Sequence, residues 1–228
     1  MRVLIVDTAL CLCTTGVFEV EGAGATPLGL CSEPMVKGHS ERLAGFARDA
    51  VAASGGGFDR IDRIGVTVGP GSFTGLRVGM AFAQGLGAAL ERPVVGISTL
   101  DALRATGGEA GAVAALIDAR RGQVYARFWI DGQPTGAAGA LSLEQAAEEV
   151  AALGRGPLLI GSGAPLLAHA APAATLLALD GPGPEALARL AAAADPASAP
   201  ARPLYLRAPD ATPSTRLPGQ ARSPGAGV

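Results

Sequence analysis

The chain has 228 residues, of which 49% are hydrophobic and 17% charged, and its formal net charge is −2. This composition excludes a largely disordered chain and is sufficient for a substantial core. The small negative net charge also excludes a general electrostatic attraction to nucleic acid.

The cysteines and the apolar runs indicate the compartment. Cys11, Cys13 and Cys31 are odd in number and have no pair at metal-site spacing, so we expect reduced thiols. No signal peptide is expected, because Asp7 interrupts the short apolar run after Met1. No apolar run reaches the roughly 20 residues of a membrane span. We therefore expect a cytoplasmic protein without membrane contact.

The first half of the chain is predicted as three strands followed by alternating helices and strands. The strands over 2–7, 14–20 and 28–31 are joined by short connections, as in an antiparallel meander. Further elements are predicted as a helix over 40–54, a strand over 64–69, a helix over 73–91, a strand over 94–98 and a helix over 99–106. This order is that of a ribonuclease-H-like half-domain, the repeating unit of the sugar kinase, Hsp70 and actin superfamily.

The second half begins in the same way but is shorter. Its predicted elements are strands over 113–119 and 123–130, a helix over 142–153, a strand over 158–163 and a helix over 184–194. We therefore predict an α/β protein with a first ribonuclease-H-like lobe over 1–106 and a reduced second lobe over 107–195. A Pro-rich tail over 196–228 follows, in which only PLYLR (203–207) is predicted to dock and the rest to be loose.

A glycine-rich turn, GPGSFTG at 69–75, opens the helix over 73–91. It has no lysine where a Walker A loop needs one, and Thr74 stands where the dinucleotide fingerprint needs its third glycine. We interpret the turn as a tight strand-to-helix connection with Ser72 or Thr74 as the N-cap. Anion binding at the helix N-terminus is the alternative.

The helix after this turn has almost no polar face. From Leu76 to Leu90 its polar side chains are Arg77 and Gln84, and small residues recur every four positions. Its four glycines together lower intrinsic helix stability by roughly 4 kcal/mol, which close approach of another backbone would offset. The helix over 40–54 is one candidate for that backbone, and a second polypeptide is the sharper hypothesis. The predicted partner interface consists of Leu43, Ala47, Ala50, Gly75, Gly79, Ala83 and Gly87.

Few residues suggest catalysis. Asp7 and Asp118 end the first strand of each half, where ATP-handling members of the superfamily carry acidic residues, but the glycines of the phosphate hairpins are missing. We interpret both as turn caps and keep Asp7, Ser72 and Asp118 as candidates for a vestigial nucleotide site. His39 and His169 lie far apart in sequence, so no metal site is predicted, and His39 is expected to face solvent or cap a helix. No catalytic residue is predicted.

Several motifs occur in an order and spacing that resemble the TsaB (YeaZ) family: RVLIVDTA, HSERL, VGPGSFTGLRVGMAFAQGLG, PVVGISTLDAL and IDARRGQVYA. PLYLR and RLPG near the C-terminus also fit. The resemblance covers 1–130 closely and 131–228 loosely. The family is similar to TsaD, the metal-bearing subunit that transfers threonylcarbamoyl to adenosine beside the anticodon of tRNAs reading codons that start with A.

The resemblance implies a non-catalytic subunit that dimerises with TsaD through its two first-lobe helices and helps to recruit TsaE, an ATPase. TsaD has an H-x-x-x-H pair where this chain has STLDAL (98–103), so the transfer chemistry does not carry over. ATP and a metal are expected to belong to the partner subunits, and tRNA to be contacted indirectly if at all. Without its partner the chain is expected to form a homodimer. The alternatives are an autonomous ATP-binding phosphotransferase and a glycoprotease-like zinc enzyme.

Overall fold

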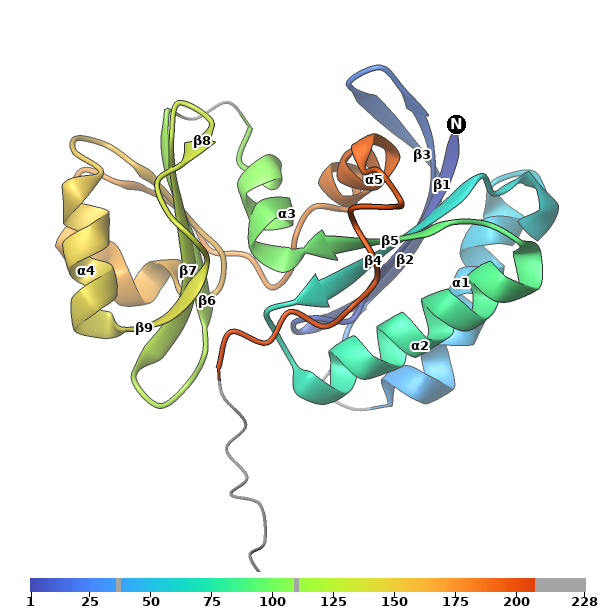
Figure 1. Ribbon diagram of the computed structural model, residues 1–228, viewed down its shortest axis with the longest axis horizontal. Helices are drawn as coiled ribbons and strands as arrows, with labels where there is room; N and C mark the ends of the chain where they lie inside the picture. Colours follow the sequence, from blue (N-terminus) through green and yellow to red (C-terminus); the bar gives the residue numbers. More distant parts are fainter. Residues whose placement is uncertain (36–37, 109–110, 208–228) are drawn as a thin grey trace, which may run out of the picture.

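The computed structural model describes residues 1–35, 38–108 and 111–207, which form two α/β lobes side by side (Figure 1). The first lobe is built on a five-stranded sheet of order β3-β2-β1-β4-β5. β1 pairs antiparallel with β2 and parallel with β4. The strands of this sheet are β1 (Arg2–Asp7), β2 (Leu12–Glu21), β3 (Gly24–Pro34), β4 (Arg63–Gly69) and β5 (Val94–Ser98).

The second sheet repeats this topology around β6, which is antiparallel to β7 and parallel to β10. β11 extends it beyond β10, and β8 and β9 both pair with β7. Its strands are β6 (Ala112–Asp118), β7 (Gln123–Ile130), β8 (Gln133–Pro134), β9 (Gly139–Ser142), β10 (Leu158–Ile160) and β11 (Thr175–Leu177). The repeat confirms the two-lobed ribonuclease-H-like fold. The second lobe is reduced, because the 3-10 helix η2 (Ala164–Ala170) stands where the first lobe has the 18-residue helix α2.

Helices cover both faces of the first sheet at its centre. The apolar side chains of β1 accordingly alternate between two core clusters, one on each face. Leu4 and Val6 pack with α1 (His39–Ala53) and α2 (Phe73–Leu90) on one side. Val3 and Ile5 pack with α5 (Pro184–Ala193) on the other. Figure 1 shows this arrangement, with α1 and α2 below the sheet and α5 above it. The short 3-10 helix η1 (Phe58–Arg60) precedes β4.

Two helices are exchanged between the lobes. Leu100 and Leu103 of α3 (Thr99–Thr106) pack on the second sheet, in a cluster that includes Trp129 and Ile160. In return, α5 from the second half of the chain packs on the first sheet. The other face of the second sheet is covered by α4 (Leu143–Ala152) and η2. The predicted boundary after residue 106 stays a prediction, since the packing units do not follow the chain order.

The segment over 195–207, which we call the strap, runs from α5 along the first lobe to the second (red in Figure 1). Gly96 N–H donates to Ala199 O at 2.9 Å, and Leu204 N–H donates to Val68 O at 2.8 Å. The prediction that only 203–207 docks is therefore wrong. The strap docks earlier because β5 is an edge strand whose free backbone groups accept a neighbour. The remainder of the predicted tail, with RLPG, lies outside the described residues.

Within the described part of the chain, no helix is both long and apolar enough to cross a membrane.

Candidate interaction surface and interlobe cavity

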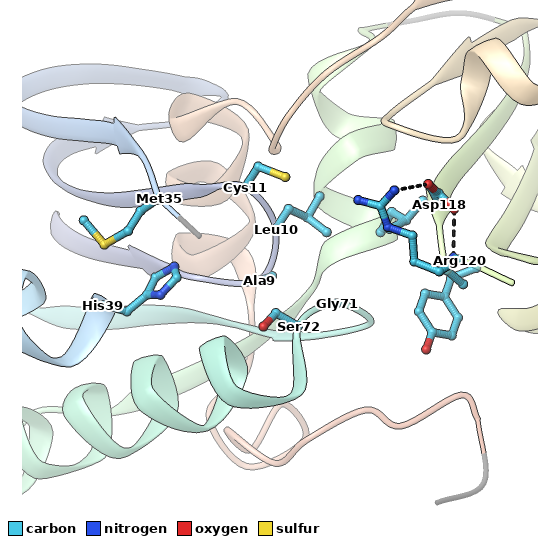
Figure 2. Close-up of a pocket in the computed structure, with 12 residues that line it drawn as sticks. Ala9, Leu10, Cys11, Met35, His39, Gly71, Ser72, Asp118 and Arg120 are labelled. Atoms are coloured by element: carbon cyan, nitrogen blue, oxygen red, sulfur yellow. Dashed lines mark hydrogen bonds and ion pairs between the residues drawn. The ribbon is translucent and has the colours of Figure 1, made fainter. Parts of the chain in front are cut away.

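A cavity of about 290 Å³ lies between the two lobes (Figure 2). The first lobe contributes the loop after β1 (9–11), the start of α1 at His39, and Gly71 and Ser72 before α2. The second lobe contributes 117–120, around the turn between β6 and β7, and Tyr125. The size is at the lower limit of pockets that hold small ligands.

Two of the three candidates for a vestigial nucleotide site line this cavity, namely Ser72 and Asp118. Ser72 is the N-cap of α2, because its Oγ accepts a hydrogen bond from Gly75 N–H at 3.2 Å. Asp118 accepts one from Arg120 N–H at 2.8 Å and forms an ion pair with the Arg120 guanidinium (dashed in Figure 2). The predicted turn-capping role of Asp118 is confirmed, and its nucleotide-binding role stays a prediction.

Asp7 does not line the cavity, because its side chain is buried below the loop that does. Its Oδ1 accepts hydrogen bonds from Ala9 N–H at 3.0 Å and from the Thr67 hydroxyl at 2.7 Å. The predicted turn cap is therefore confirmed here too. Burial raises the pKa of Asp7 from its ordinary value, and the two hydrogen bonds oppose the rise only partly.

This raised pKa predicts a pH-dependent effect of Asp7→Asn. As pH rises above 3.8, the unfolded carboxyl loses its proton while the folded one retains it, so the wild-type free energy of unfolding falls through this range. Asn accepts the same two hydrogen bonds and does not titrate. Urea unfolding between pH 4 and pH 8 should therefore show the stability of the variant relative to wild type increasing with pH. A constant or decreasing difference would contradict the assignment.

His39 lies at the start of α1 with only 8% of its surface exposed, and its imidazole points toward Ser72 and Ala9 at the edge of the cavity (Figure 2). The expectation of a solvent-facing or capping role is wrong. Gly38, with φ of 87°, occupies the N-cap position, and no side chain caps this helix. The left-handed backbone at Gly38 is a conformation that glycine adopts without strain.

The partner interface predicted on the first-lobe helices is buried within the chain itself, and this corrects the prediction for Leu43, Ala47, Ala50, Gly75, Gly79, Ala83 and Gly87. A Cβ at Gly75 or Gly79 would collide with Thr8, whose hydroxyl also donates to Gly75 O at 2.8 Å. The small residues thus let α2 approach the end of β1, not a second chain. Substitutions at Gly79 or Ala83 would test the fold and not an interface.

Between Leu76 and Leu90, the two polar side chains of α2 are Arg77 and Gln84, and both bind the strap. Arg77 Nε donates to the Tyr205 hydroxyl at 3.2 Å, and Gln84 Nε2 donates to Ala201 O at 2.8 Å. The two residues are seven positions apart, which places them along one side of the helix. The sequence pattern identified this line of polar residues correctly, but its occupant is the chain's own C-terminal segment.

A second face of α2 is apolar and partly exposed, although its larger residues also pack in part against the core. Its residues recur at spacings of three and four and are exposed or half-exposed. We call this set the outer face of α2; its members are Val78, Ala81, Phe82, Gly85, Leu86 and Ala89. No atom lies within 4 Å of a Cβ built at Gly85. α1 runs beside α2 (Figure 1), and its residues Ala44 and Gly45 are exposed and half-exposed. A partly exposed apolar surface of this kind is a candidate association site.

The segment STLDAL (98–103) has a structural role at the start of α3. Ser98 caps the helix by accepting from Asp101 N–H at 3.3 Å. Asp101 Oδ1 in turn lies 2.7 Å from Arg127 Nη1 of β7, which ties α3 to the second sheet. Among the described residues, no three His, Cys, Asp or Glu side chains gather as metal ligands would.

Comparisons with known proteins agree on one family. Residues 26–150 match the family model described as TsaD, tRNA N6-adenosine threonylcarbamoyltransferase. An uncharacterized protein of Mycobacterium tuberculosis is 38% identical over 216 residues, which cover 92% of this chain and 94% of that protein. The tRNA threonylcarbamoyladenosine biosynthesis protein TsaB of Escherichia coli is 37% identical over 130 residues, 55% of this chain and 53% of that protein. The solved structure of YeaZ from Pseudomonas aeruginosa is 28% identical, with a TM-score of 0.71 over 90% of this chain and 99% of that one.

Proposed function

This chain belongs to the TsaB (YeaZ) family, and from that premise we propose that it is a non-catalytic subunit of the bacterial complex that adds threonylcarbamoyl to adenosine beside the anticodon of tRNA. It binds TsaD through the outer face of α2 and the neighbouring surface of α1, activates that subunit and helps to recruit TsaE. ATP and the catalytic metal belong to these partners.

The outer face of α2 is the observation that carries this proposal. Val78, Phe82 and Leu86 leave apolar surface in water on one side of a single helix. Covering such surface contributes about 25 cal/mol per Å². Ala81 and Gly85 lie between the larger residues, so a partner helix can approach closely at the centre of the face.

Three carboxylates near the predicted sites have structural roles. Asp7 and Asp118 accept hydrogen bonds within their own turns, and Asp101 pairs with Arg127. Each is therefore engaged in holding the fold. The reaction then depends on groups that TsaD and TsaE supply.

Reconstitution tests the proposal directly. The chain, TsaD and TsaE from one organism are mixed with tRNA, ATP and the activated threonylcarbamoyl donor, and modified adenosine is measured. The complete mixture should modify tRNA, whereas omission of this chain should reduce the rate strongly. The chain alone should neither hydrolyse ATP nor modify tRNA. Catalysis by the isolated chain, or unchanged activity without it, would contradict the proposal.

The same outer face should also support a homodimer in the absence of TsaD. An uncovered apolar face pairs with any complementary surface, and a second copy provides one. Light scattering during size-exclusion chromatography should show a concentration-dependent dimer that is displaced when TsaD is added.

An ATP-binding phosphotransferase is the competing function. Ser72 and Asp118 favour it, because both line the interlobe cavity. Titration calorimetry with ATP and Mg²⁺ distinguishes the two functions. We expect no heat beyond dilution, since Asp7 is shielded from the cavity and its charge is not available to a metal-bound nucleotide.

A further inference from the structure

One edge of the molecule brings together exposed aromatic rings and arginines from segments far apart in the sequence. Phe73 at the start of α2 is 54% exposed, and Tyr205 of the strap is 47% exposed. Their ring centroids lie 5.5 Å apart. The Arg77 guanidinium lies 3.8 Å over the Phe73 ring and also donates to the Tyr205 hydroxyl. Both rings thus present apolar surface to water beside a fixed positive charge.

Further arginines follow on the second lobe. Arg207, at the end of the strap, donates to Ala119 O at 3.2 Å and lies 5.7 Å over the Tyr125 ring. The Arg120 side chain is 83% exposed. Arg120 and Arg121 both have a left-handed backbone, with φ of 61° and 55°, which is unfavourable for any residue that has a Cβ. The turn between β6 and β7 therefore places arginine in solvent at a conformational cost.

The interlobe cavity connects these groups. It extends from Ser72, next to Phe73, to Arg120 and Tyr125 (Figure 2). Asp118 is the one carboxylate among the described residues that line it, and Arg120 neutralises it by an ion pair. The edge is thus locally positive although the net charge of the chain is −2. We call Phe73, Arg77, Arg120, Tyr205 and Arg207 the aromatic–arginine surface.

We propose that the aromatic–arginine surface binds single-stranded RNA, as exposed in a tRNA loop; this inference rests on the proposed function. Bases stack on exposed aromatic rings, while arginines pair with the phosphates between them. Both rings stay about half exposed although they help to hold the strap, and the exposed Arg120 extends the surface beyond it. The inference replaces the expectation that this subunit contacts tRNA only indirectly.

Fluorescence anisotropy with the full chain and a labelled, unstructured RNA of about 12 nucleotides tests the stacking. Phe73→Ala and Tyr205→Ala should each weaken binding roughly tenfold, since each removes one stacking platform. Tyr205→Phe retains the ring and should bind nearly as wild type, which separates stacking from loss of the hydrogen bond to Arg77. Arg155→Ala, an exposed arginine next to α4, is the matched control and should have no effect. Circular dichroism melts verify that each variant is folded.

Two further measurements decide the class of partner. Affinity for single-stranded RNA should exceed that for a duplex of equal length and fall as salt rises, with less dependence on salt in Arg120→Ala. Equal binding to duplex RNA or heparin, or wild-type affinity in both alanine variants, would overturn the inference. Co-purification of each variant with TsaD is measured in parallel. Loss of TsaD binding with unchanged RNA binding would assign the surface to the protein interface, whereas failure of wild type to bind TsaD would refute the proposed function instead.

Discussion

Ala81→Arg should weaken binding to TsaD strongly while leaving the fold intact. Ala81 is exposed at the centre of the outer face of α2, where an arginine can extend into water in the free chain. In the complex the same guanidinium would be buried against an apolar partner surface, and an unpaired buried charge is strongly unfavourable. We expect the dissociation constant to rise by about 30-fold or more, the effect of a central contact residue. Titration calorimetry with purified TsaD measures this change.

Ala151→Arg is the matched control, because Ala151 is an exposed helical alanine on α4 of the second lobe. It should bind TsaD as wild type does. Both variants should melt close to the wild-type temperature. Equal binding by wild type and Ala81→Arg would place the interface elsewhere on the molecule.

Gly75→Ala and Gly85→Ala should change stability in opposite directions, although both add one methyl group to α2. At Gly75 the new Cβ meets the carbonyl oxygen of Thr8, which belongs to the backbone and cannot rotate away. Overpacking of this kind lowers the free energy of unfolding by about 1–3 kcal/mol. At Gly85 the Cβ meets nothing within 4 Å, so the higher helix propensity of alanine should raise stability by about 1 kcal/mol.

Urea unfolding of the two variants and of wild type measures these differences. The pair establishes which side of α2 faces the protein's own sheet. If Gly75→Ala were as stable as Gly85→Ala, the close packing of α2 on Thr8 would be wrong. If Gly85→Ala lost stability, the outer face would already be covered within the monomer.

The sequence predicted the framework of the fold because its main strands are long and strongly patterned. The strand over 2–7 and the helix over 73–91 match β1 and α2 closely, and their order identified the two-lobed fold. Several short elements were missed, although the three-residue strand β10 was predicted within 158–163. β11 has three residues, all exposed, and the Ala-rich η2 has no pattern that separates a 3-10 helix from a loop.

The candidate interface was predicted on residues of α1 and α2 that the structure buries, so the interface that we propose lies on another side of α2. Glycines four residues apart indicate close approach of a backbone without saying whether a helix or a strand approaches. Here the approaching group is Thr8, at the end of β1. Arg77 and Gln84 carried the missing signal, since both bind the strap and so define an edge of the exposed surface. That assignment requires the docked position of the C-terminal segment, which depends on contacts distant in sequence.

Site-specific photo-crosslinking tests the central claim most directly. A benzophenone amino acid replaces Phe82 on the outer face of α2 in one sample and Leu166 of the second lobe, which is 40% exposed, in another. After irradiation of the mixture with TsaD, mass spectrometry identifies the cross-linked peptides. The account predicts efficient cross-links to TsaD from position 82 and few from position 166. Cross-links from 166 with none from 82 would contradict it.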